Sequence, residues 1–398
     1  MTLSPLPILR LKPKMSPRHI RHGFPWVYDN ELVTDRRSWA IAPGTIGLLE
    51  DAERNPVALV AINPNSRIMA RVLDRDTGAE IGRAWIEARL RRAFDLRSRL
   101  FETPYYRLVH AEADGLPGVI IDRFGDVAVI QPNAAWAEAM IETLSEALVA
   151  VTGVSTVIKN ASGRARSLEG LDEESAVLRG AAPEGPLAVP MNGATYMADL
   201  MGGQKTGIFY DQRPNHAFAA RFAPGARVLD VFSHVGGFSL AALAGGAESA
   251  VAVDGSEPAL ALAEAGAAAM GAEARFATRR GDAFAQLEAL AAEGESFDVV
   301  ICDPPAFAPT KKALDRGLRA YERVARLAAP LVREGGLLGL CSCSHAADLG
   351  AFRGASVRGI GRAGREARLI HTGFAGPDHP MHPQLAESGY LKALFFAL

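Results

Sequence analysis

Hydrophobic and polar positions divide the chain into three stretches of different periodicity. Residues 1–74 hold short apolar runs parted by Pro, Gly and Asn, a pattern typical of a small β-rich module. Residues 75–184 hold two stretches of helical periodicity, 80–101 with an arginine-rich outer face and 135–151, and two apolar runs joined by a turn at 123–126. The pattern therefore predicts a β-rich domain followed by a small α+β domain.

The third stretch, residues 185–398, begins with a hairpin signal and continues as strand–helix alternation. Asn192-Gly193 separates two apolar runs and tolerates the two positive φ angles of a type I′ turn. The strands expected after it are apolar rather than alternating, as in parallel sheets covered by helices on both faces. They are residues 227–232, 249–254, 274–278, 297–302, 336–341 and 367–371. This order predicts a doubly wound α/β domain.

Length and composition agree with a globular protein of several domains. The chain has 398 residues, of which 48% are hydrophobic and 22% charged. Its three cysteines, Cys302, Cys341 and Cys343, do not make a disulfide framework and are typical of the reducing cytoplasm. No apolar run reaches the length of a membrane span, and the first residues lack the apolar core of a secretory signal. We therefore expect a cytoplasmic protein with no membrane partner.

Charge is distributed unevenly along the chain, although the net charge is only −2. Residues 1–107 hold 18 Lys and Arg against 12 Asp and Glu, a balance of +6, and the remainder has a balance of −8. Such asymmetry is expected where one domain meets phosphates. Within the basic part, Arg18, Arg21, His22 and Trp26 place aromatic and basic side chains together, so we expect them to bind RNA. A solvated arginine-rich surface, with the aromatics buried in a small barrel, is the alternative.

A glycine-containing loop follows the first strand of the α/β domain and predicts a nucleotide-like cofactor. Asp230 ends that strand, and the loop that follows approaches a ligand closely because of its glycines. Asp254, at the end of the next strand, can accept hydrogen bonds from both ribose hydroxyls, and Asp282 from an adenine amine. The loop lacks GxGxxG, which favours S-adenosylmethionine over a dinucleotide. The loop residues expected to contact the cofactor are Phe232, Ser233, Gly236 and Gly237.

Asp303-Pro304-Pro305 ends another strand of the same sheet, and prolines force the chain to leave it there. It leaves at the carboxyl edge, where α/β sheets bind ligands. Asp303 can hydrogen-bond a ring nitrogen or an exocyclic amine, and Phe307 can stack on a base. The motif indicates methylation of a nitrogen or carbon on a planar ring.

Cys343 distinguishes methylation of a ring carbon from methylation of a nitrogen. Methylation of an amine needs no thiol, whereas carbon 5 of cytosine becomes nucleophilic only after a thiolate adds to carbon 6. A metal group formed by Cys341, Cys343 and His345 is disfavoured, since no second ligand pair has zinc spacing. We therefore predict no metal site, and interpret Cys302 and Cys341 as structural.

Several motifs together resemble the bacterial family of 23S ribosomal RNA large-subunit cytosine-5 methyltransferases. The resemblance covers nearly the whole chain and implies a PUA domain (1–74), a small α+β domain (75–184) and a class I, Rossmann-like methyltransferase domain (185–398). Members carry a basic residue at the position of His216. The segments that resemble the family are residues 63–68, 112–118, 204–213, 303–307, 342–344 and 378–383.

The resemblance also implies roles for individual residues. The nucleophile of the family falls on Cys343, and Lys205, Tyr210 and Asp211 would cover the amino-acid end of the cofactor, S-adenosylmethionine (SAM). Two alternatives stay open: methylation of a guanine nitrogen in RNA with Cys343 inert, and an RNA-binding ribosome assembly factor without catalysis. The sequence also leaves open whether the protein forms a homodimer.

Overall fold

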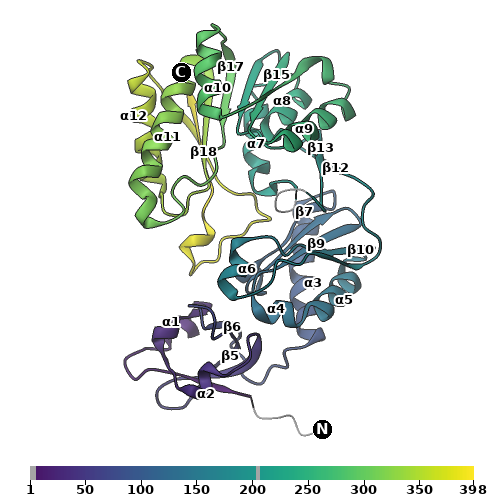
Figure 1. The fold of residues 1–398 in the computed structure, drawn as a ribbon, viewed down its shortest axis with the longest axis vertical. Coiled ribbons are helices and arrows are strands. Elements are labelled where there is room, and N and C mark those ends of the chain that lie inside the picture. Colours follow the sequence, from purple (N-terminus) through teal and green to yellow (C-terminus); the bar gives the residue numbers. More distant parts are fainter. Residues whose placement is uncertain (1–5, 203–206) are drawn as a thin grey trace. The chain divides into compact units, whose positions relative to one another are not determined.

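The computed structural model describes residues 6–202 and 207–398. The chain divides into two compact units (Figure 1). Unit 1 comprises Met1–Ala182 with Asp378–Ala386, and unit 2 comprises Pro183–Pro377 with Glu387–Leu398. No helix in the described part of the chain is long and apolar enough to cross a membrane.

The N-terminal part of unit 1 is built on a six-stranded sheet of order β2-β6-β5-β4-β1-β3. Its core forms around β5, whose sequence PVALVAI is buried at every position after the proline. Such a continuous apolar run is typical of a central strand. The elements are β1 (Ile8–Leu11), α1 (Arg18–Arg21), β2 (Trp26–Val27), β3 (Leu32–Val33), α2 (Arg36–Trp39), β4 (Thr45–Glu50), β5 (Pro56–Ile62) and β6 (Ala70–Asp74).

The second part of unit 1 is a five-stranded sheet of order β11-β10-β9-β8-β7 with helices packed on it. The predicted hairpin at 118–131 is confirmed, with Gly125 at φ 66° in its turn. The helix predicted over 135–151 is wrong as one element, because the chain breaks at Met140 (φ −108°, ψ 20°). The elements are α3 (Arg83–Leu100), β7 (Tyr105–His110), β8 (Val119–Phe124), β9 (Val127–Pro132), α4 (Ala135–Ala139), α5 (Ile141–Thr152), β10 (Thr156–Lys159), α6 (Arg164–Glu169) and β11 (Ala176–Arg179).

Residues 378–386 pack with unit 1 although the chain on both sides of them lies in unit 2. Asp378 is fully buried, and it accepts a hydrogen bond from the backbone N–H of Arg107 (3.1 Å). The guanidinium of Arg97, also fully buried, donates to the Asp378 carbonyl (2.9 Å) and to both carboxylate oxygens of Asp114 (2.6 and 2.8 Å). These charge-assisted bonds fix the segment on the second sheet of unit 1.

Unit 2 opens with a hairpin and continues as a seven-stranded sheet of order β16-β15-β14-β17-β18-β20-β19. The hairpin is confirmed, with Asn192 and Gly193 at φ 55° and 75°. Its strands and those of the sheet are β12 (Leu187–Met191), β13 (Ala194–Ala198), β14 (Arg227–Val231), β15 (Ser249–Asp254), β16 (Phe276–Arg280), β17 (Phe297–Cys302), β18 (Val332–Ser342), β19 (Arg368–Gly373) and β20 (Lys392–Ala397).

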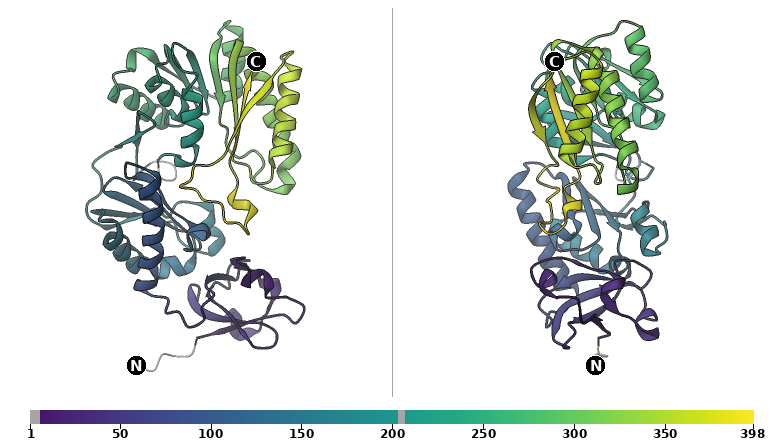
Figure 2. Two further views of the ribbon diagram at one scale, coloured as in Figure 1. Left: turned by 180° about the vertical axis from the view of Figure 1, so that it is seen from behind. Right: turned by 90° about the vertical axis from the view of Figure 1, so that its left-hand side faces the viewer.

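The helices of unit 2 alternate with these strands and cover both faces of the sheet (Figure 2). From β14 the chain passes through β15 to β16 on one side and then returns to β17, β18 and β19 on the other. Right-handed crossovers therefore place α8 and α9 on one face and α10–α12 on the other, and α7 packs on α8. The predicted doubly wound α/β fold is confirmed. The helices are α7 (Arg213–Ala220), α8 (Gly237–Ala244), α9 (Glu257–Ala269), α10 (Ala283–Ala292), α11 (Leu314–Ala328) and α12 (Leu349–Arg362).

Candidate functional site

The site predicted from the sequence lies within unit 2, at the carboxyl edge of its sheet. Parallel pairing of β14 with β15, of β14 with β17 and of β17 with β18 ends these four strands at one edge. The strand ends bring Asp230, Asp254, Asp303 and Cys343 to that edge. The strand order reverses between β15 and β17, and doubly wound sheets bind ligands at such a point.

The loop after β14 is held by the buried carboxylate of Asp230. Its Oδ2 accepts hydrogen bonds from the backbone N–H groups of Phe238 (3.1 Å) and Ser239 (2.8 Å) at the start of α8. Phe232 and His234 adopt φ 64° and 49°, in the left-handed region. This conformation costs free energy in residues other than glycine, and proteins keep it mainly at functional sites. The loop therefore has a fixed, strained shape between strand and helix.

Gly237 of this loop lies against His216. A Cβ atom at Gly237 would stand 2.7 Å from His216 Nε2, so any side chain there would displace the imidazole. His216 is buried between Tyr196 and Phe238, and burial lowers its pKa to about 3, which keeps it neutral. A neutral imidazole thus supports the loop from behind.

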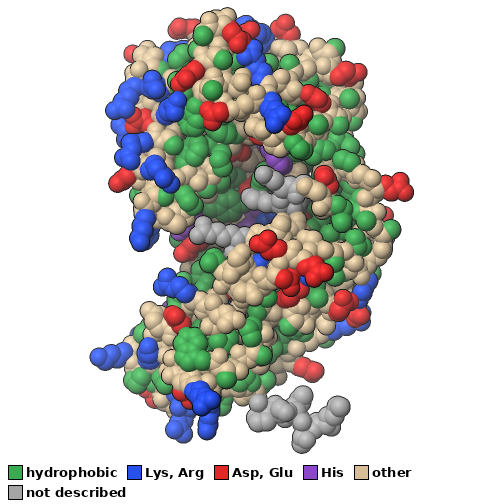
Figure 3. Space-filling model, in the orientation of Figure 1, with side chains coloured by type: hydrophobic (Ala, Val, Ile, Leu, Met, Phe, Trp, Pro, Cys, Tyr) green, Lys and Arg blue, Asp and Glu red, His purple; other side chains and the backbone are tan. Residues whose placement is uncertain are grey.

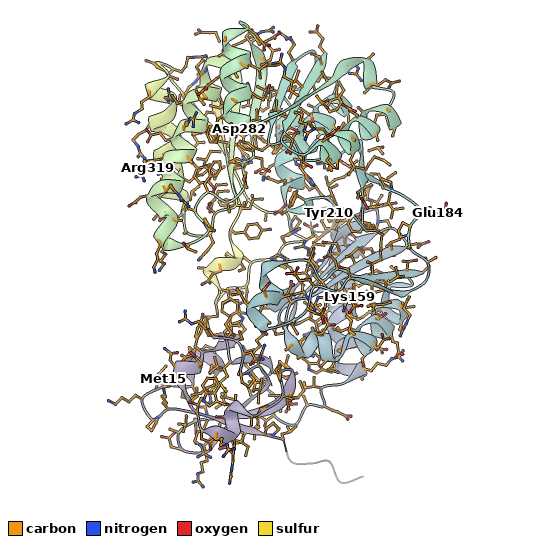
Figure 4. All side chains as sticks on the ribbon, in the orientation of Figure 1. Met15, Lys159, Glu184, Tyr210, Asp282 and Arg319 are labelled. Atoms are coloured by element: carbon orange, nitrogen blue, oxygen red, sulfur yellow. The ribbon has the colours of Figure 1, made fainter. Side chains whose placement is uncertain are left out.

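Asp254 and Asp282 occupy the ends of the next two strands, as predicted. Asp254 accepts from the backbone N–H groups of His234 (2.9 Å) and Ser256 (2.8 Å), so it ties β15 to the glycine loop. Asp282 caps α10 by accepting from the N–H of Ala285 (3.0 Å) and is exposed (Figure 4). Each carboxylate oxygen has a second lone pair, so both groups can accept further bonds from a ligand.

Four buried oxygens in and beside the loop have no hydrogen-bond partner among the described residues. They are Oδ1 of Asp211, Oδ1 of Asp230, Oγ of Ser233 and Oγ of Ser239. Buried polar atoms are nearly always paired, so an unpaired group of this kind is typical of a place where a polar ligand binds. Burial raises the pKa of Asp230 to about 6, opposed by the N–H bonds from Ser239 and Phe238. These acceptors fit a ligand that carries an amino group.

The segment before α7 links the loop region to Asp303. Asp211 Oδ2 accepts a bond from the hydroxyl of Tyr390 (2.6 Å), and Tyr210 is almost fully buried. The amide nitrogen of Gln212 donates to Asp303 Oδ2 (2.9 Å), so this segment orients the Asp303 carboxylate. Lys205, predicted to contact the same end of the cofactor, lies outside the described residues.

The loop that carries Cys343 is held by hydroxyl groups of neighbouring elements. Tyr321 of α11 hydrogen-bonds the hydroxyls of Ser342 (2.9 Å) and Ser344 (2.7 Å), the two residues that flank the cysteine. Ser344 Oγ also accepts from the backbone N–H of Ala308 (2.9 Å), beyond the Asp-Pro-Pro motif. The Cys343 loop and the Asp303 loop are therefore fixed to each other.

Lys392 of β20 forms the opposite side of this loop. Its side chain is 5% exposed, and its ammonium donates to the carbonyls of Ser344 (2.7 Å) and Ala347 (2.8 Å). Burial lowers the pKa of Lys392, while negative charge at Cys343 and at Asp348 opposes that shift. A buried cation thus stands beside the predicted nucleophile.

The three thiols differ in their environment. Cys302 and Cys341 are buried in the sheet, and burial, with negative charge nearby, raises the pKa of both thiols. Cys343 is partly exposed at the carboxyl edge. The contrast agrees with the interpretation of Cys302 and Cys341 as structural.

Phe307 lies in an aromatic cluster rather than alone at the surface. Its ring centroid is 6.3 Å from that of Phe232, 6.2 Å from Phe284 and 5.0 Å from Tyr321. Phe232, which opens the glycine loop, therefore also lies against the Asp303 loop through the ring of Phe307. Stacking of Phe307 on a base stays a prediction.

The residues predicted to bind RNA lie in unit 1. Arg18, Arg21 and His22 are exposed, and Arg21 pairs with Asp51 (3.2 Å). Trp26 is half-buried, donating from Nε1 to Glu112 (2.8 Å). The predicted arginine-rich face of the helix at 80–101 is smaller than expected, because Arg97 is fully buried and Arg89 pairs with Asp74 (2.7 Å).

Sequence reasoning did not assign Gln212, Tyr321 or Lys392. Gln212 lies in the segment 204–213, which resembles the family. The resemblance therefore marked its position, but it did not indicate that Gln212 orients Asp303. Tyr321 and Lys392 belong to α11 and β20, and no motif in the sequence marks either residue. Within the described ranges, no group of three or more His, Cys, Asp or Glu side chains could hold a metal ion.

Comparisons with known proteins place the chain in a family. The sequence profile of S-adenosylmethionine-dependent methyltransferases matches residues 139–397, and that of PUA-like domains matches residues 9–75. The "Ribosomal RNA large subunit methyltransferase I" of Cronobacter sakazakii is 33% identical over 374 residues, 92% of this chain and 93% of that protein. The "Ribosomal RNA large subunit methyltransferase" of Deinococcus radiodurans is also 33% identical, over 99% and 98% of the two chains.

Solved structures share the fold. A putative SAM-dependent methyltransferase from Streptococcus mutans has a TM-score of 0.82 at 19% identity, covering 98% of this chain and all of that one. A putative methyltransferase crystallised with SAH has the same TM-score at 20% identity, over 98% and 99% of the chains. The expected PUA-like domain, class I fold and SAM cofactor are confirmed, and this chain belongs to the SAM-dependent methyltransferase family that includes the ribosomal RNA large-subunit methyltransferases.

Proposed function

We propose that this protein, acting in the cytoplasm, methylates carbon 5 of a cytosine in 23S ribosomal RNA through a covalent bond to Cys343. The names of its relatives support ribosomal RNA of the large subunit as the substrate. The observation that carries the cytosine-5 proposal is the setting of Cys343. It is a partly exposed thiol, next to a buried ammonium, on a loop fixed to the loop of Asp303.

The residues at the carboxyl edge fit SAM. Asp254 would accept from the ribose hydroxyls and Asp282 from the adenine amine, as carboxylates do at this edge. The glycine loop, with the unpaired oxygens of Asp211, Asp230 and Ser233, would hold the amino-acid end. When bound, SAM supplies an electrophilic methyl group.

Cys343 and Asp303 would act on the base itself. The Cys343 thiolate adds to carbon 6, which breaks the carbon 5–carbon 6 double bond and directs its electron pair to carbon 5. Asp303, oriented by Gln212, shares a proton with ring nitrogen 3 as charge develops on the ring. After carbon 5 takes the methyl group, a base removes the proton from carbon 5, the double bond re-forms and the thiolate leaves.

Three domains are proposed for the chain: residues 1–74 and the helix after them bind RNA, 75–184 form the small α+β domain, and 185–398 catalyse. Arg18, Arg21, His22 and Trp26 would contribute to RNA affinity, and Phe307 would stack on the target base.

Bisulfite sequencing of 23S ribosomal RNA tests the proposal directly. RNA from cells that lack the protein should convert at one cytosine that is protected in wild-type cells, and complementation with the intact gene should restore protection. Nucleoside analysis of RNA methylated by the purified protein should give 5-methylcytidine. If methylguanosine appeared instead, the cytosine-5 proposal would be wrong and Cys343 would have another role.

Replacing Asp254 should weaken SAM binding. A hydrogen bond to a charged group contributes about 1.5–3 kcal/mol, so Asp254→Ala should raise the Kd about 10- to 100-fold by calorimetry. Because Asp254 also accepts from His234 and Ser256, Asp254→Asn is the matched variant that retains one acceptor. An unchanged Kd in both variants would contradict the assigned role of Asp254.

A further inference from the structure

A stripe of five basic side chains follows one side of α11 and the short 3-10 helix (Lys311–Ala313) before it. The positions repeat every three or four residues, which places them on one helical face, and all five are exposed. Figure 3 shows basic side chains gathered over α11 and α12, and Figure 4 labels Arg319 among them. The members of this stripe are Lys312, Arg316, Arg319, Arg323 and Arg326.

Most of the charge in the stripe is not neutralised. Among the described residues, only Arg323 has an acidic partner, the exposed Glu288 at 3.1 Å. Glu322, the second acid of α11, is turned inward and binds Arg358 (3.0 Å) and Arg362 of α12. The stripe is therefore a local positive surface on a part of the chain whose overall balance is negative.

The stripe begins beside the Asp303 loop, which includes Phe307 and Ala308. Gly317, in the first turn of α11, packs so closely on this loop that an added Cβ would stand 2.8 Å from the carbonyl oxygen of Phe307. The inner side of the same helix carries Tyr321, which holds Ser342 and Ser344 on either side of Cys343. One helix thus joins the nucleophile loop to the exposed basic face.

We propose that the stripe on α11 binds the sugar-phosphate backbone of the RNA strand that carries the target base. This inference rests on the proposed RNA substrate and adds a contact surface in the catalytic unit. A base that reaches Cys343 brings its neighbouring phosphates to the start of α11. From Lys312 to Arg326 the helix rises about 21 Å, enough to follow several consecutive phosphates.

Salt-dependent RNA binding by the full-length protein tests the stripe. The variant Arg316→Gln/Arg319→Gln removes two cations without a described partner. The control, Arg333→Gln/Arg368→Gln, removes two arginines at the opposite, amino ends of β18 and β19. Binding to deproteinised 23S ribosomal RNA is measured over a series of salt concentrations, together with KM for RNA, kcat and the Kd for SAM.

Each lost phosphate contact lowers the slope of log K against log salt by about 0.7–0.9, so the stripe variant should lose about 1.4–1.8. Its KM for RNA should rise while kcat and the Kd for SAM stay unchanged, and the control should match the wild type. A wild-type slope in the stripe variant, or an equal loss of slope in the control, would overturn the inference. The stripe would then not bind RNA, and an acidic protein would become the partner to consider. Methylguanosine as product would refute the cytosine-5 proposal and leave this result intact.

Discussion

Cys343→Ala should abolish both methylation and the covalent complex with RNA that contains 5-fluorocytosine. Fluorine at carbon 5 cannot leave as a proton does, so the wild-type adduct between Cys343 and carbon 6 should persist on a denaturing gel. Loss of a nucleophile costs on the order of 10⁴-fold or more in turnover, and the adduct cannot form without the sulfur. Turnover is measured from transfer of labelled methyl groups to RNA.

Cys341→Ala is the matched control because its thiol lies two residues away, buried, with a raised pKa. Cys341→Ala should still form the adduct and methylate RNA. Its only expected effect is a loss of about 1–2 kcal/mol in stability, because the substitution leaves a small cavity. Asp303→Asn should reduce adduct formation, since it cannot share a proton with ring nitrogen 3. If Cys343→Ala still methylated its RNA, the guanine-nitrogen alternative would replace the cytosine-5 proposal.

The sequence predicted the parts of the fold that depend on local pattern. Apolar runs predicted the strands that became β15 and β17 to the residue, and Asn192-Gly193 predicted its hairpin. The carboxyl-edge positions of Asp254 and Asp303 followed from the strand ends, because parallel strands share their edges. These features need only a few neighbouring residues.

Features that depend on distant contacts could not be predicted in this way. β20 inserts antiparallel between β18 and β19, and nothing in its own residues indicates that neighbour. Residues 378–386 pack with unit 1 through Asp378 and the buried Arg97, a side chain that the sequence placed on an exposed face. Summed charge likewise pointed to the first 107 residues and hid the stripe on α11, since acids elsewhere in the chain cancel it.

Lys392→Met should make the Cys343 thiol harder to ionise. The ammonium is buried beside the loop, and negative charge at Cys343 favours its protonated form. This coupling is reciprocal, so the ammonium must favour the thiolate by the same free energy. Removing a neighbouring positive charge makes a thiolate harder to form, so the midpoint of Cys343 ionisation should move upward in Lys392→Met.

The rate of Cys343 alkylation by iodoacetamide, followed by mass spectrometry from pH 6 to 10, reports this midpoint without any methyl transfer. Methylation near neutral pH should fall in Lys392→Met and recover in part as pH rises, because thiolate forms again above the new midpoint. Met also leaves the carbonyls of Ser344 and Ala347 unpaired, at a cost in stability of about 1–3 kcal/mol each. This loss of stability is expected even if Lys392 has only a structural role. Lys392→Arg, which keeps the charge, should retain the wild-type midpoint, and coincident alkylation profiles in Lys392→Met and wild type would show that Lys392 only holds the loop.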